Sequence, residues 1–400
     1  MSRCYGMRPE DQVKLTQQGI KISHLKEIFI RTLRSGGISR AQLKREMHLS
    51  FPSVSALVDE LLASGILEET DSVSCSTRGR PSILLRVCAG RCAIPVVTMQ
   101  YDGYLCRLYD LASNLIDCRL IPFNFVQSAN DSPDGKRYPD MKSLCDPLLN
   151  WLEEVQSAQN VPALILSTPG TFNKEGVLTS SSMCLSTPPD FLSYLSNAAE
   201  LTIYQGNTSE HYAYGEYYRG NRKDDFALIL ISRGVGAAVV RDGVIRESKP
   251  TRAGEFGHIS IDYRGRKCIC GGRGCLERYI STEVLAADTA LDFDALCSKY
   301  REGDGATVSF LNERAELLAM GISNMLTIQP VENVVLGGKI TLLGDEFLNA
   351  VRESVRNIGY RKAMDRVQLR YSERAEDTGA LGALWHYFEK NLDLSSFGCI

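Results

Sequence analysis

Hydrophobic residues near the N-terminus recur with the period of an α-helix in three successive stretches. In residues 22–35, apolar side chains return every three or four positions, and a pair of glycines ends the run. Ser39 and Ser50 are suitable N-caps for two further helices, residues 40–47 and 51–64. The pattern therefore predicts a first core helix followed by two short helices joined by a tight turn.

Two strand-like runs follow these helices, at residues 66–70 and 82–87. The segment between them, residues 71–81, is polar and rich in turn-forming residues, so we expect a hairpin. Arg78 and Arg80 stand at its tip, where guanidinium groups can clamp phosphates or enter a minor groove. This order predicts a winged helix-turn-helix, although a small protein-interaction module has a similar pattern.

The N-terminal segment, residues 1–92, has a net charge opposite in sign to that of the whole chain. Residues 1–92 contain 14 Lys and Arg against 9 Asp and Glu, while all 400 residues carry a net charge of −3. The basic excess suits a polyanionic partner. We expect Arg40 and Lys44 to contact phosphates, and Ser53 and Ser55 on the third helix to lie against bases.

From residue 93 onward, strand-like and helical stretches alternate. Residues 93–123 predict a three-strand meander, 141–156 an amphipathic helix, and 226–245 a strand hairpin interrupted by glycines. This alternation indicates a two-lobed α/β body that divides near residue 205. The expected domains are residues 1–90, a first lobe at 91–205 on which a C-terminal helix (376–400) packs back, and a second lobe at 206–375.

One short segment of the second lobe carries four metal-binding side chains. His258 is followed by Cys268, Cys270 and Cys275, and three intervening glycines permit the bends that bring the thiols together. One imidazole and three thiolates form the closed tetrahedral set of a structural zinc site, with no position left for a reactive water. We expect one zinc ion per chain with a positioning role.

Two segments of the chain resemble the ROK family of repressors, open reading frames and kinases. The first is ISRAQLKREMHLSFPSVSALVDELLASGILEE with the following STRGRP, within residues 20–88. The second and more specific is GEFGHISIDYRGRKCICGGRGCLE, residues 254–277. The resemblance implies an α/β fold class, in which an N-terminal winged helix-turn-helix precedes a two-lobed, actin-like and sugar-kinase-like (ribonuclease H-like) domain.

The same resemblance implies a sugar pocket beside the metal. Its expected effector-binding residues are Asn207, Glu255, His258 and Glu277, with one ring nitrogen of His258 on zinc and the other on the sugar. Carboxylates suit vicinal diols because each oxygen accepts one hydroxyl proton. The alternative is that these residues support the metal ligands or cap helices.

Two parts of the family's kinase machinery are missing from this sequence. Family kinases use the pattern NDxxxxxxGE with the aspartate as general base, whereas this chain has Asn207 followed by Thr208, whose hydroxyl cannot accept that proton at neutral pH. In place of a DxGxT-like phosphate turn stands Asp102-Gly103, which predicts an ordinary hairpin turn. The later Gly234-Val235-Gly236 is compatible with a phosphate cradle or with a close strand crossing. We therefore expect no catalytic residues and no enzymatic activity.

These observations favour a transcriptional repressor that binds operator DNA as a homodimer or dimer of dimers and responds to a sugar or sugar phosphate. An active ATP-dependent sugar kinase, and a repressor whose sensor domain docks a protein, are the alternatives. The chain contains 13 cysteines but no long apolar run, so we expect reduced thiols, no membrane segment and a cytoplasmic location. The sequence does not distinguish glucose, N-acetylglucosamine, xylose or their phosphates.

Overall fold

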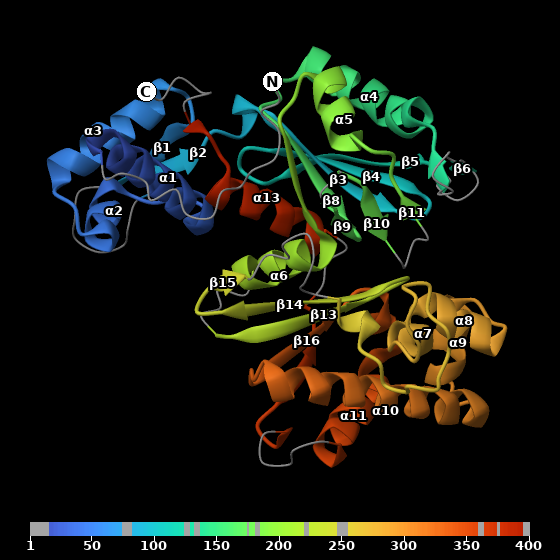
Figure 1. Cartoon of the computed structure of the whole chain (residues 1–400). Helices are drawn as coiled ribbons and strands as arrows, with labels where there is room; N and C mark the ends of the chain where they lie inside the picture. The colour runs from blue at the N-terminus through green and yellow to red at the C-terminus, as the bar shows by residue number, and fades with distance from the viewer. Residues whose placement is uncertain are drawn as a thin grey trace.

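The structure, a computed structural model, consists of an N-terminal helical domain and two α/β lobes (Figure 1). In this view the sheet of the first lobe lies above the sheet of the second lobe. The described residues are 16–73, 82–123, 129–131, 137–173, 176–180, 185–219, 224–245, 255–358, 364–373 and 377–394.

The N-terminal domain has the predicted order of three helices and a β-hairpin. Ser39 forms a capping box with Gln42 at the second helix, and Ser50 accepts a hydrogen bond from the backbone of Ser53 at the third. Gly36 ends the first helix in the left-handed region, at φ 64°. The elements are α1 (Gln17–Ser35), α2 (Arg40–Met47), α3 (Phe51–Ala63), β1 (Leu67–Val73) and β2 (Ser82–Val87).

The first lobe is built on a five-stranded sheet in the order β12-β8-β3-β4-β5. Strands β3, β4 and β5 form the predicted antiparallel meander, and β8 and β12 are added in parallel. The predicted helix at 141–156 is α4, which buries Leu144, Leu148 and Leu152. The elements are β3 (Ala93–Gln100), β4 (Gly103–Asp110), β5 (Leu115–Pro122), β8 (Leu164–Thr168), β12 (Ile203–Asn207), α4 (Met141–Ala158) and α5 (Phe191–Ala199).

The second lobe repeats this topology with the strand order β15-β14-β13-β16-β17. The first three strands are again antiparallel and the last two parallel. Its strands are β13 (Phe226–Ile231), β14 (Val235–Arg241), β15 (Val244–Ile245), β16 (Asn333–Gly337) and β17 (Gln368–Tyr371). Its helices are α7 (Glu277–Ile280), α8 (Thr282–Thr289), α9 (Phe293–Arg301), α10 (Gly305–Ile328) and α11 (Gly344–Asn357).

Two helices, α6 (Thr208–Arg219) and α13 (Thr378–Lys390), cross where the lobes meet, and we call them the hinge helices. Helix α6 leads from β12 of the first lobe to β13 of the second, and α13 returns from β17 to pack on β3 and β8. A Cβ on Gly382 would lie 1.7 Å from the carbonyl oxygen of His211, and one on Gly215 would lie 2.1 Å from that of Thr378. Only glycine permits this close crossing.

The remaining short strands form small sheets at the edge of the first lobe. They are β6 (Ala129–Asp131), β7 (Arg137–Pro139), β9 (Thr171–Phe172), β10 (Leu178–Ser180) and β11 (Leu185–Ser186). Within the part of the chain that the structure describes, no helix is both long and apolar enough to cross a membrane.

Candidate metal centre and effector pocket

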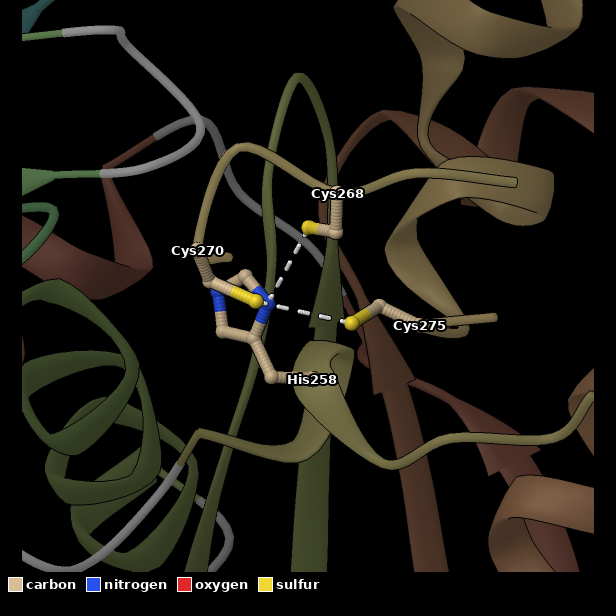
Figure 2. Close-up of side chains that lie close together, drawn as sticks. All are labelled: His258, Cys268, Cys270 and Cys275. Atoms are coloured by element: carbon tan, nitrogen blue, oxygen red, sulfur yellow. Dashed lines mark hydrogen bonds between the residues drawn. The ribbon is translucent and has the colours of Figure 1, made fainter. Parts of the chain in front are cut away.

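The four predicted metal ligands converge in the structure. One ligand atom from each of His258, Cys268, Cys270 and Cys275 lies within 4.8 Å of the others. Figure 2 shows the four side chains pointing toward one another. Cys268 Sγ is 3.6 Å from His258 Nδ1, and Cys270 Sγ is 3.6 Å from Cys275 Sγ. Bond lengths of about 2.3 Å to sulfur and 2.0 Å to nitrogen in a tetrahedron give ligand–ligand distances of roughly 3.5 to 3.8 Å. The donor set and its spacing therefore fit a zinc ion.

In the loop that carries the cysteines, glycines allow backbone segments to pass very close to one another. Gly271 and Gly274 have φ angles of 92° and 66°, which L side chains rarely adopt. A Cβ on Gly274 would lie 1.7 Å from the carbonyl oxygen of Asp262. The backbone N–H of Cys268 also donates to the carbonyl of Gly272. We call residues 255–277 the metal loop.

Three of the four predicted effector ligands lie on this metal loop. Because Nδ1 of His258 faces the sulfur atoms, its Nε2 faces outward and lies 3.7 Å from a carboxylate oxygen of Glu255. Glu255 is exposed, whereas Glu277 is buried at the start of α7. The carboxylate of Glu277 accepts the backbone N–H of Val235 at 2.9 Å, and burial raises the pKa of this carboxyl.

The fourth predicted ligand, Asn207, comes from the first lobe, at the carboxyl end of β12. Its Oδ1 accepts the backbone N–H of Ser209 at 2.8 Å, and its Nδ2 donates to the carbonyl of Gly170 at 3.3 Å. These bonds orient the side chain at the start of α6. No hydrogen bond described in the structure joins Asn207 to the metal loop.

Thr208, the residue that we expected at the position of the kinase base, belongs to a polar cluster that sequence reasoning missed. Ser167 Oγ lies 3.4 Å from Thr208 Oγ1 and 3.0 Å from His211 Nδ1. Burial, with a smaller contribution from His386, lowers the pKa of His211 to about 3. The cluster is therefore uncharged at neutral pH. No sequence signal pointed to His211, because its partner Ser167 lies 44 residues away.

A second contact missed by sequence reasoning joins the two lobes. The guanidinium carbon of Arg233, in the turn after β13, lies 3.4 Å from the ring centroid of Tyr101, in the turn after β3. Arg233 also forms an ion pair with Glu283 of α8. Its Nε is buried and has no hydrogen-bond partner among the described residues.

The predicted DNA-binding residues differ in their exposure and in their ion pairs. Arg40 pairs with Asp59 at 2.9 Å and also with Glu69 inside its own domain. Lys44 and Ser53 are exposed, and the side chain of Lys44 makes no ion pair with the described residues. Ser55 is half-buried, and Arg78 and Arg80 lie outside the described residues.

Comparison with known proteins identifies a family, sequence relatives and structures with the same fold. The model of the ROK family matches residues 142–389. The chain is 25% identical over 376 residues to the xylose repressor of Bacillus subtilis, covering 92% of this chain and 95% of that protein. A crystal structure of a ROK family transcriptional regulator, a homologue of the E. coli MLC protein, covers 92% of this chain and 97% of its own at TM-score 0.75 and 20% identity. The ROK hexokinase of Thermus thermophilus covers 73% and 96% at TM-score 0.58 and 20% identity.

Proposed function

The chain belongs to the ROK family, and from this we propose that it is a DNA-binding transcriptional repressor that responds to a sugar or sugar phosphate. The observation that carries the proposal is the winged helix-turn-helix domain, because phosphorylation of a sugar does not require a DNA-binding domain. Relatives of nearly the same length are named xylose repressor, and a full-length structural neighbour is a ROK transcriptional regulator.

The DNA interface in this proposal is the N-terminal side of α3, with α2 and the hairpin beside it. Ser53 and Ser55 would meet base edges, and Lys44 would contact a phosphate. Arg40 would support this face by holding α2 to α3 and β1 through its ion pairs. Arg78 and Arg80 would supply the wing. Two copies are needed to read two half-sites, so we propose a homodimer.

The sensor in this proposal is a sugar site that Asn207 on one lobe would form with Glu255, His258 and Glu277 on the other. A zinc ion held by His258 and the three cysteines would fix the metal loop and neutralise its thiolates. With Nδ1 on the metal side, Nε2 of His258, which lies 3.7 Å from a carboxylate oxygen of Glu255, would meet a sugar hydroxyl together with that carboxylate. We propose that zinc is structural, because the four protein donors complete a tetrahedral shell.

Phosphoryl transfer is not part of this proposal, because no carboxylate stands at position 208. The hydroxyl of Thr208 and the neutral His211 behind it give the sugar no base of the kinase type. What remains is binding. A ligand that contacts both lobes changes their relative position only if it binds the two arrangements unequally.

Binding and release can be measured together on the zinc-loaded protein. We would record thermal stability and operator affinity against a panel of sugars, sugar phosphates and ATP. A ligand that raises the melting temperature and changes operator affinity supports the proposal. Operator binding that no sugar or sugar phosphate alters would favour a sensor that docks a protein, and ATP consumption with any sugar would establish a kinase instead.

A further inference from the structure

Strand β5 forms one edge of the first lobe's sheet. It pairs with β4 on one side, and no strand in the part of the chain that the structure describes pairs with its other side. An edge strand presents backbone N–H and C=O groups that can bind a further strand. Residues 117–122 keep a regular register with β4, and the one irregularity lies before them. This stretch therefore offers a regular edge for pairing.

One face of β5 carries apolar side chains that are open to solvent. Leu115, Ile116 and Leu120 have exposed fractions of 48%, 50% and 49%. Cys118, which lies among them, is also exposed. Covering apolar side chains of this size with a partner is favourable, and a contiguous exposed group of them is typical of an interaction surface.

The charged side chains of β5 lie on its other face. Asp117 and Arg119 alternate with Cys118 along the strand and so point to the opposite side of the sheet. Arg119 donates through Nε to Asp117 Oδ2 at 2.7 Å and through Nη1 to Glu154 of α4 at 2.9 Å. Neither Asp117 Oδ1 nor Arg119 Nη2 forms a hydrogen bond with another described residue. One acceptor and one donor therefore remain for a partner.

The order of residues along β5 is symmetric about Cys118. The positions next to it carry opposite charges, Asp117 and Arg119, and the positions beyond these are apolar, Ile116 and Leu120. If two copies of the strand run antiparallel with Cys118 opposite Cys118, each Asp117 meets Arg119 of the other copy. Each Ile116 likewise meets Leu120. Pairs of both kinds are stabilising across strands, and an isologous interface requires such self-complementarity.

From these observations we infer that β5 is an interface between two copies of this chain, whose β5 strands pair antiparallel about a two-fold axis at Cys118. The pairing joins two five-stranded sheets into one sheet of ten strands. Because the axis is perpendicular to the sheet, the α4 sides of both copies lie on the same face, and two Asp117 and two Arg119 side chains form one group of alternating charges. The inference goes beyond the proposed function, since it depends on neither DNA nor sugar.

Cys118 provides the direct test. Residues directly opposite in an antiparallel pair have Cα atoms about 4.5 to 5.5 Å apart, so a short bismaleimide can link the two thiols. We would treat the zinc-loaded full chain at micromolar concentration and identify linked residues by peptide mass mapping. A link between Cys118 of two copies is expected as the main product, and Cys118→Ser should abolish it. Links through other cysteines alone, or no link between copies, would overturn the inference.

Charge reversal tests whether the two strands are paired in this register. Asp117→Arg alone and Arg119→Asp alone each place like charges opposite one another, so the yield of the Cys118 link should fall roughly tenfold or more. A one-to-one mixture of the two variants should restore the link, since opposite charges face each other again between unlike copies. The repulsion within each chain is the same alone and mixed, so rescue reports the contact between copies. Failure of the mixture to restore the link would contradict the pairing.

A leucine of equal exposure elsewhere provides a control for the apolar face. Leu120→Asp should lower the yield of the link roughly tenfold or more, whereas Leu342→Asp, at a leucine that is 50% exposed in the second lobe, should leave it within about twofold. Equal yields in the two variants would remove the apolar face from the interface. A protein that binds operator as a dimer without any Cys118 link would keep the proposed function and lose this interface.

The reverse outcome is also distinguishable. A chain that forms the Cys118 link but binds no operator DNA would keep this interface and lose the proposed function.

Discussion

Phe29 of the N-terminal domain packs edge-on against Phe388 of the C-terminal hinge helix, with ring centroids 5.3 Å apart. The contact belongs to one buried cluster that runs from α1 through α13 to β3 and β8. The N-terminal domain therefore packs directly against the hinge helices. Figure 1 shows α13 between that domain and the lobes. A change in the hinge helices would consequently reorient the proposed DNA-reading face.

Arg34 should govern this docking. Its guanidinium pairs with Glu389 at 2.8 Å and lies 4.9 Å from the ring of Tyr218 on α6. We expect Arg34→Ala to weaken the junction by about 1 kcal/mol and to reduce the effect of ligand on operator affinity.

Arg31→Ala is the matched control, because among the described residues Arg31 forms ion pairs only within its own domain, with Glu27 and Glu46. Limited proteolysis would report the docking and fluorescence anisotropy the operator affinity. If both variants show the same proteolysis and the same ligand effect on operator affinity, Arg34 does not link ligand binding to DNA binding.

Lys44 and Arg40 should differ in their effects on DNA binding. Lys44 is exposed, so Lys44→Ala should lower operator affinity and reduce the slope of log affinity against log salt by about 1. Arg40 is already paired with Asp59 and Glu69, so Arg40→Ala should mainly lower the melting temperature. Affinity measured over a salt series, with thermal unfolding in parallel, distinguishes the two. A full unit of slope lost in Arg40→Ala would reverse these assignments.

Gly382→Ala should be strongly destabilising. A Cβ there would lie 1.7 Å from the carbonyl oxygen of His211, so the hinge helices would have to separate. We expect a loss of roughly 1 to 3 kcal/mol or more in the free energy of unfolding. Gly305→Ala at the start of α10 is the control, since nothing lies within 4 Å of the added atom. Urea denaturation checks both, and equal stability of the two variants would contradict the close crossing.

Buried His211 should make stability depend on pH. Its pKa in the folded state is about 3, below the unfolded value near 6.5, so the unfolded chain binds the extra proton. Stability is then fully present above pH 6.5 and falls toward pH 3, by about 2 kcal/mol between pH 7 and pH 5 from this group alone.

His211→Asn should flatten that part of the pH profile, and His48→Asn, at an exposed helix end, should leave it unchanged. Chemical denaturation at a series of pH values provides the measurement. A profile of unaltered steepness in His211→Asn would show that other groups cause the loss.

Removing the metal should expose one set of thiols and leave another protected. With a chelator present, we expect iodoacetamide to modify Cys270, which is exposed and whose thiolate no metal ion would then hold. Burial raises the pKa of Cys106 and Cys145 to about 12, so both should stay unmodified in the folded protein. Peptide mass mapping with and without added zinc reads out each site. Modification of Cys270 at the same rate in both samples would exclude metal binding there.

Local signals in the sequence were sufficient for the features that form locally. The caps at Ser39 and Ser50, the meander, and the metal quartet within 18 residues were all predicted, because their spacing is visible along the chain. The first helix begins at Gln17, earlier than expected, because Thr16 caps it.

Contacts between distant segments could not be predicted in this way. Arg233 and Tyr101 belong to different lobes, and the glycines at 215 and 382 acquire their role only where two helices cross. The shared strand order of the two lobes left no detectable repeat in the sequence, because many hydrophobic residues satisfy the same sheet pattern.

The partner of the N-terminal domain is encoded very late in the chain, since Arg34 and Glu389 are 355 residues apart. At a translation rate of about 5 to 20 residues per second, the apolar face around Phe29 waits roughly 20 to 70 seconds for α13 to be made. A nascent chain can thus present a folded DNA-reading unit with its docking surface still bare. During that interval the exposed apolar face is open to aggregation, and the junction can assemble only after α13 has been made.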